Sequence, residues 1–281
     1  MIPRLRLMTT NSWSSWSTIA SDQLKDGGDL VLLGDIFDLW RRDFVKALME
    51  SREVISKLIE LKLKDKVKIH YLAGNHDYHM LRMSELLFND MDGSVKSDRL
   101  DESDLIGKFP FKVTKSLRLE EGGNKFFFIH GYQLEVLANP YYKSMSAYET
   151  FSEGLCLAGD DTGNAADKLW ETYETSKSVL EGLKHLPTDI QGALTSMMNP
   201  PDNRLSGSHQ THTIVEQVAI SKARAIYLGM GEDEILVFGH THAPFYEAEN
   251  GVVNTGSWKK RPCRDYTYLE ISDGQVKPAT F

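Results

Sequence analysis

Cysteine is scarce in this chain, and long hydrophobic runs are absent from it. The two cysteines, Cys156 and Cys263, lie far apart and show no CxxC spacing. This argues against a disulfide framework or a thiolate zinc site and favours a reducing, cytoplasmic location. No apolar run approaches the roughly 20 residues of a membrane-spanning helix. Residues 1–18 hold no continuous apolar segment, so no signal peptide is predicted.

The chain also lacks an excess of positive charge. Its formal net charge is −8 at pH 7. This argues against sequence-independent binding to nucleic acid, which needs a basic face, and it disfavours a nuclease. An anionic substrate stays compatible with the charge, because a metal ion or a local arginine can reverse the sign of the potential inside a cleft.

Four short apolar runs each end in Gly, Asp, Asn or His. They cover residues 29–35, 67–77, 124–131 and 234–242. Continuous apolar runs of this length are typical of strands that are buried on both faces, as in α/β proteins. The polar residues would then lie at the carboxyl ends of the strands, where open α/β sheets usually carry their sites.

The segments around these runs complete a mixed α/β pattern. Residues 41–66 contain no Gly or Pro and repeat apolar residues at near-helical spacing, which predicts an amphipathic helix between the first two strands. Residues 111–121 alternate apolar and polar side chains, as a half-exposed strand does. Residues 251–258 and 265–272 predict two more strands.

Residues 139–230 have a different character. They lack strand-like runs and hold helical stretches such as residues 166–186. We interpret them as a helical insertion that caps the sheet edge or covers the site. Because the insertion lies between two core strands, residues 1–281 are expected to form a single domain.

The predicted strand ends combine carboxylate, amide and imidazole side chains. In chain order they are Asp35, Asp38, Asn75, His76, Asp77, His130, His240 and His242. This oxygen and nitrogen set suits Mn²⁺, Fe or Zn²⁺, whereas a calcium site would not need several histidines. In an extended chain residues i and i+2 point to the same side, so the histidines of GHTH would converge on one spot.

Such a group has a definite chemical use. Two metal ions about 3.5–4 Å apart, bridged by a carboxylate, can activate a water molecule and hold a phosphoryl group. Asp35 is the natural bridge between two ions. His76 is the natural acid or charge stabiliser, and Asp77 is available to orient its ring.

Four motifs carry a resemblance to a known family. GDIFD, GNHD, an isolated His in FIHG, and GHTH occur in that order and resemble the calcineurin-like metallophosphoesterases. GDIFDLW, together with NTGSW after GHTH, is most similar to the branch that contains UDP-2,3-diacylglucosamine pyrophosphohydrolase. The resemblance covers roughly residues 29–138 and 231–272. It implies two mixed β-sheets in a sandwich flanked by helices, with the helical insertion outside every motif.

The resemblance also implies residue roles. Asp35 would bridge two divalent ions, with Mn²⁺ expected first and Fe or Zn²⁺ as alternatives. Asn75, His130 and His240 would complete one metal site, and His242 would belong to the other. The implied reaction is hydrolysis of a phosphate ester or pyrophosphate bond in a small phosphorylated or nucleotide-diphosphate substrate, with His76 assisting the departure of the leaving oxygen.

One family motif is missing. The family opens with a strand that ends in D-x-H, but this chain has no Asp or His before Asp22. One metal site therefore keeps four ligands, while the other keeps only Asp35 and His242. Two explanations stay open: a degenerate, one-metal member with a binding or regulatory role, or a shifted reading frame or misassigned start in the first residues.

Two neighbours of these motifs have ordinary alternatives. Asp38, three residues after Asp35, is expected to support the site or to be structural rather than to bind metal. Arg41 and Arg42 follow GDIFDLW directly. One of them could contact a substrate phosphate through its planar guanidinium, and an exposed helix start explains them equally well.

Overall fold

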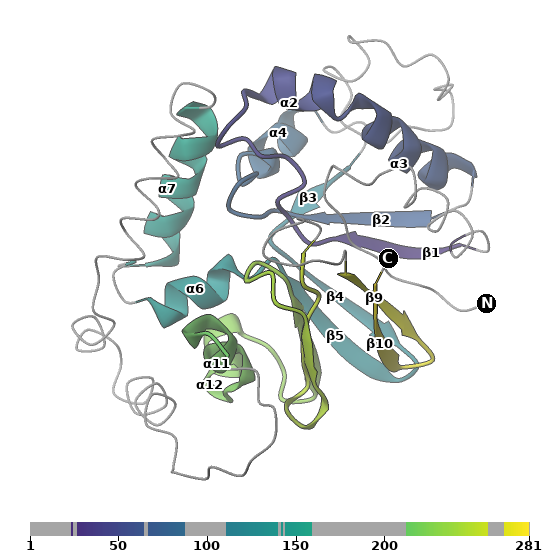
Figure 1. The fold of residues 1–281 in the computed structure, drawn as a ribbon, viewed down its shortest axis with the longest axis vertical. Coiled ribbons are helices and arrows are strands. Elements are labelled where there is room, and N and C mark those ends of the chain that lie inside the picture. The colour runs from purple at the N-terminus through teal and green to yellow at the C-terminus, as the bar shows by residue number, and fades with distance from the viewer. Residues whose placement is uncertain are drawn as a thin grey trace.

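The computed structural model describes residues 24, 27–64, 67–87, 111–139, 142, 144–158, 212–257 and 267–280. Within these residues the chain forms a three-stranded sheet, a five-stranded sheet and a two-stranded hairpin. Figure 1 shows one group of helices over the first sheet and another beside the second. The predicted helix at 166–186 lies outside the described residues.

The first sheet is parallel and has the order β1-β2-β3, with β1 at Gly28–Leu32, β2 at Val67–Leu72 and β3 at Val113–Thr114. The predicted βαβ unit is confirmed, although both long strands end before their polar residues. The predicted helix between them is two helices, α2 (Phe44–Glu50) and α3 (Arg52–Lys64). They part at Ser51, and α2 begins where the Asp43 carboxylate accepts a bond from Lys46 N at 2.9 Å.

The second sheet is mixed and has the order β4-β5-β6-β8-β7. Its strands are β4 (Ser116–Glu121), β5 (Asn124–Ile129), β6 (Glu234–Phe238), β7 (Phe245–Glu247) and β8 (Val252–Asn254). A short 3-10 turn, η3 (Ala248–Asn250), joins β7 to β8. The strands β5, β6 and β8 run parallel, and the outer two are antiparallel to their neighbours.

The predicted strand at 111–121 is divided between the two sheets. Its first part, β3, pairs with β2, and its second part, β4, pairs with β5. The chain therefore crosses from one sheet to the other at Lys115. The hairpin of β9 (Thr267–Ser272) and β10 (Gln275–Thr280) turns at Asp273 and Gly274, which both have positive φ.

An apolar core joins the two sheets. Val31 and Leu72 of the first sheet pack with Phe126, Phe128 and Val237 of the second. These strands are hydrophobic on both faces because a second layer covers each sheet. The hairpin contributes to the same core through β9. The predicted mixed α/β sandwich is confirmed, with a first sheet that is wholly parallel in the part described.

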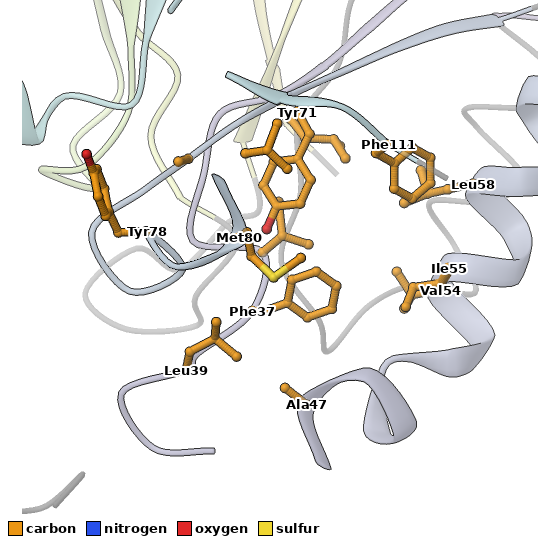
Figure 2. Packing of buried hydrophobic residues seen from close by; sticks show 14 of the residues in the cluster. Phe37, Leu39, Ala47, Val54, Ile55, Leu58, Tyr71, Tyr78, Met80 and Phe111 are labelled. Carbon is orange, nitrogen blue, oxygen red and sulfur yellow. The ribbon is translucent and has the colours of Figure 1, made fainter. Parts of the chain in front are cut away.

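Helices cover the outer faces of the sheets. Figure 2 shows how α2, α3 and α4 (Met80–Leu87) enclose a second core on the first sheet, built around Phe37, Tyr71 and Met80. A third core holds α6 (Tyr132–Ala138), α11 (Ile214–Ile220) and α12 (Ala223–Leu228) against β5 and β6. The helix α7 (Met145–Ala158) runs between these two groups (Figure 1).

The predicted insertion at 139–230 includes α7, α11 and α12. Of these, α11 and α12 share an apolar core with the second sheet, so they are part of the domain's packing. Whether residues 139–230 form one inserted unit stays a prediction, because residues 159–211 lie outside the described part. No helix among the described residues is long and apolar enough to span a membrane.

The packing of the sandwich core predicts that two Leu→Ala substitutions differ in their effect on the free energy of unfolding. Leu269 of β9 is 1% exposed between the sheets, whereas Leu86 of α4 is 70% exposed. Leu269→Ala is expected to lower the free energy of unfolding by about 2–5 kcal/mol, because it leaves a cavity. Leu86→Ala should change it by less than about 0.5 kcal/mol. Urea unfolding followed by circular dichroism measures both, and equal effects would contradict the placement of the hairpin.

Candidate metal and catalytic site

Four loops meet at one end of the sandwich. They follow β1, β2, β5 and β6, and they bring together Asp35, Asn75, His76, His130 and His240. These five residues all follow predicted strands, and the structure places them close together. The site thus takes two loops from each of the two sheets.

The Nε2 atom of His130 is at the centre of this group. It lies 3.2 Å from Asn75 Oδ1, 3.2 Å from His240 Nδ1 and 3.3 Å from Asp35 Oδ2. His130 is almost fully buried, at 3% exposure. Four potential ligand atoms therefore face one another at the edge of the buried core.

In His130 and His240, the ring nitrogen outside this group has a hydrogen-bond partner that fixes the tautomer. His130 Nδ1 lies 2.5 Å from the carbonyl oxygen of Leu33, which can only accept a hydrogen bond. His240 Nε2 lies 2.6 Å from Glu135 Oε2. In a neutral imidazole the proton is then on these nitrogens, and the lone pairs of His130 Nε2 and His240 Nδ1 both point into the group.

Four electron-rich atoms that face one another repel unless a positive charge lies among them. Burial alone lowers the pKa of His130, but the charge and hydrogen bond of Asp35, the hydrogen bond to Leu33 and the charge of Asp77 together raise it. For Asp35 the opposite holds: burial raises the pKa, yet His130 and His76 together hold it well below its usual value. The group thus favours positive charge at its centre, which a proton or a cation supplies.

The donor set fits a divalent cation. Metal–nitrogen and metal–oxygen bonds of about 2.0–2.2 Å place neighbouring ligand atoms roughly 3–3.5 Å apart, and the three atoms around His130 Nε2 lie at such distances from it. Histidines that bind metals also donate their second N–H to a carbonyl or carboxylate. Among the described residues, no group of three or more His, Cys, Asp or Glu side chains is placed so that it could hold a metal ion; the set described here is mixed and includes the amide of Asn75.

His76 lies beside this group in a fixed orientation. Its Nδ1 atom is 3.0 Å from Asp38 Oδ1, and its ring stacks on Trp40 with centroids 3.9 Å apart. The backbone N–H of His76 donates to Asp35 Oδ1 at 2.9 Å. Burial raises the pKa of Asp38, but His76 and Arg41 lower it by more. His76 is therefore set by Asp38 and Trp40, both from the GDIFDLW motif.

Asp77 has a different place from the one predicted. The residue paired with the His76 ring is Asp38, so the expectation that Asp77 orients this ring is wrong. Asp77 Oδ2 accepts from Ile36 N at 2.7 Å and from the Tyr71 hydroxyl at 2.5 Å, and Oδ1 accepts from Gly74 N at 2.7 Å. Its carboxyl group joins the loop after β1 to the loop after β2.

The arginines after GDIFDLW have partners on their own segment. Arg41 donates to Asp38 Oδ2 at 2.7 Å, and Arg42 donates to Glu50 Oε2 at 3.1 Å. Because Asp38 binds both His76 and Arg41, the guanidinium of Arg41 helps to hold the carboxylate that positions the imidazole.

The GHTH loop is not extended. β6 ends at Phe238, and both His240 and His242 have positive φ, at 64° and 61°. The expectation that an extended backbone points both rings to one side is therefore wrong. Thr241 between them accepts from Asn254 at 2.7 Å and donates to the buried Glu216 of α11 at 2.6 Å. His240 joins the donor group described above, and His242 lies half-buried two residues further on.

Two residues of the site could not be assigned to it from the sequence. Trp40 was visible as the last residue of GDIFDLW, but nothing in the sequence indicated its stacking on His76. Glu135 was visible as the only acid in the apolar helix YQLEVLA, and a buried acid in such a helix needs a partner. No family motif includes it.

Comparison with known proteins identifies the family. Residues 11–244 match the family model "Calcineurin-like phosphoesterase". This match covers well over half of the chain, and the chain therefore belongs to the calcineurin-like phosphoesterases, a family of phosphoester hydrolases that use divalent metal ions. The predicted superfamily is confirmed.

Other comparisons add little to this assignment. No curated protein sequence matches the chain. A solved structure described as "Structural and Functional Characterization of a Novel Archaeal Phosphodiesterase" is similar, with a TM-score of 0.42, 11% identity and 99% of each chain covered. At that level the likeness supports no statement about substrate.

Close backbone packing at the site predicts a contrast between two glycines. Gly34 and Gly123 both have φ of +81°, but a Cβ on Gly34 would lie 2.5 Å from Gly74 N and 2.7 Å from His130 Nδ1, while one on Gly123 meets nothing within 4 Å. Gly123→Ala should cost about 1–2 kcal/mol for its backbone conformation alone. Gly34→Ala should cost about 2–5 kcal/mol, because it also forces the site loops apart.

Thermal and urea unfolding of the two variants measures this difference. Mn²⁺ binding by calorimetry should be unchanged in Gly123→Ala and lost or strongly weakened in Gly34→Ala. Equal stability losses together with equal metal binding would show that the close approach of Gly34, Gly74 and His130 is not required.

Proposed function

We propose that this protein is a metal-dependent hydrolase of phosphate ester or pyrophosphate bonds. The observation that carries the proposal is the convergence of Asp35, Asn75, His130 and His240, with both imidazoles in the tautomer that presents a lone pair to the same point. Family membership supports the reaction class, and the donor set supports metal dependence with Mn²⁺, Fe or Zn²⁺.

In this proposal the residues have two roles, metal binding and proton donation. Asp35, Asn75, His130 and His240 would hold a divalent ion, which supplies an activated water and neutralises charge on the phosphoryl oxygens. His76 lies beside them with Nδ1 held by Asp38, so in its doubly protonated, imidazolium form Nδ1–H donates to Asp38 and Nε2–H is the group available to the substrate. As the water oxygen bonds to phosphorus and the bond to the leaving oxygen breaks, His76 would pass its proton to that oxygen.

The alternative is a one-metal family member that binds a phosphorylated ligand without hydrolysing it. This alternative follows from the missing D-x-H motif, which leaves His242 and Asp35 as the only sequence candidates for a second ion. His242 stays a proposed ligand of that ion.

The finer substrate assignment is also a proposal. GDIFDLW and NTGSW resemble the UDP-2,3-diacylglucosamine pyrophosphohydrolase branch, and the structure gives the Trp of GDIFDLW a physical part in stacking on His76. A pyrophosphate diester such as a UDP-sugar therefore belongs in the substrate panel beside a monoester and bis-p-nitrophenyl phosphate.

Metal titration and turnover test the proposal together. The wild type should bind Mn²⁺ and hydrolyse at least one member of the panel. Asp35→Asn should reduce turnover by about 100-fold or more, because it removes the only anionic donor of the group. His70→Gln is the matched control, since His70 pairs with Asp29 at 2.6 Å elsewhere on the first sheet. One ion per chain without turnover would favour the binding protein, and a fully active Asp35→Asn would refute the site.

Asp38 gives a second prediction for the reaction. Asp38→Asn leaves the shape intact but weakens the hold on His76, so kcat should fall about 10- to 100-fold, with KM within about threefold of the wild type. Glu50→Gln is the control, because Glu50 likewise binds an arginine of the same segment but does not contact His76. If Asp38→Asn raises KM and leaves kcat unchanged, His76 does not act in the chemical step.

A further inference from the structure

Glu135 is a buried carboxylate on an otherwise apolar helix. It lies on α6 at 6% exposure, between Leu134 and Val136 in the core. Burying a carboxylate is costly unless it is paired and hydrogen-bonded. A carboxylate at this position therefore lowers the stability of the fold unless its contacts offset the cost of burial.

Among the described residues, the Glu135 carboxylate contacts one imidazole of the site and two tyrosine hydroxyls. Its Oε2 atom lies 2.6 Å from His240 Nε2 and accepts from the Tyr148 hydroxyl at 3.3 Å. Its Oε1 atom accepts from the Tyr142 hydroxyl at 3.3 Å. Tyr142 and Tyr148 also pack edge to face, with ring centroids 4.5 Å apart. Two tyrosines thus hold the carboxylate that holds His240.

The contact with His240 has two chemical consequences. It places the ring proton on Nε2, so that Nδ1 presents its lone pair to the group around His130. It also adds negative charge behind a donor set in which Asp35 is the only carboxylate. Both effects strengthen His240 as a ligand for a cation.

We propose that Glu135 is a positioning residue of the proposed metal site: it fixes the tautomer and orientation of His240 and supplies negative charge directly behind it. This inference rests on the proposed metal-dependent function. It adds a residue that lies outside every motif by which the family was recognised. It also connects α7, through Tyr148, to a proposed metal ligand.

The tautomer of His240 tests positioning in the metal-free protein. ¹⁵N NMR of histidine-labelled protein, assigned with His240→Gln, should show His240 protonated at Nε2 in the wild type. Glu135→Leu removes the acceptor and should abolish this preference. An unchanged ¹⁵N pattern in Glu135→Leu would overturn the inference, whatever the protein does with metals.

Metal affinity tests the charge. Glu135→Gln keeps the shape of the side chain, so it should fold, and it should weaken Mn²⁺ binding about 10- to 100-fold by calorimetry. Glu149→Gln is the matched control: Glu149 on α7 accepts from the Tyr132 hydroxyl at 3.1 Å and pairs with Lys115, without a recorded contact to His240. Its affinity for Mn²⁺ should stay within about threefold of the wild type.

The outcomes separate this inference from the proposed function. Wild-type affinity in Glu135→Gln, or equal losses in Glu135→Gln and Glu149→Gln, would overturn the role of Glu135 while leaving the metal site intact. If the wild type binds no Mn²⁺, Fe or Zn²⁺, the proposed function fails and the charge role of Glu135 fails with it. The NMR result then decides separately whether Glu135 positions His240.

Discussion

Two hydrogen bonds set the chemistry of this protein, because they decide where two imidazole protons lie. The carbonyl of Leu33 takes the proton of His130, and Glu135 takes the proton of His240. Each bond turns the remaining lone pair toward the same point, where the oxygens of Asn75 and Asp35 already lie. A group of this kind is stabilised by positive charge inside it, which a proton or the proposed divalent ion would supply.

The rigidity of the site comes from the loops that carry these residues. Asp77 binds backbone N–H groups of both loops of the first sheet, and Gly34 and Gly74 allow those loops to approach closely. On the second sheet, Thr241 ties the GHTH loop to Glu216 of α11. Preorganisation of this type keeps ligand atoms together before any ion arrives, which lowers the reorganisation cost of binding.

The sequence predicted β1, β2, β5 and β6, whose ends carry the five residues that meet, because continuous apolar runs and ordered motifs are local signals. It did not predict β7 or β10, and the strand expected at 111–121 is divided between the two sheets. It did not predict which carboxylate orients His76. Asp38 and Asp77 both lie in motifs next to His76 or Asp35, and only the folded backbone shows that Asp38 reaches the His76 ring. The positive φ angles of GHTH could not be predicted either. The expectation that His240 and His242 point to the same side assumes an extended strand, but β6 ends at Phe238. Glu135 was missed because its contact with His240 spans 105 positions in the chain.

His240 and His242 therefore have unequal surroundings, although the motif GHTH presents them as a pair. His240 has a carboxylate behind it and three ligand atoms of other residues in front of it. Thr241, between the two histidines, donates a hydrogen bond to Glu216 of α11. This bond holds the loop in place at the residue between the two rings. Asp35 lies in the donor group and Glu135 lies behind His240, so two carboxylates favour positive charge on the His240 side. Metal stoichiometry measures directly whether the protein binds one ion or two.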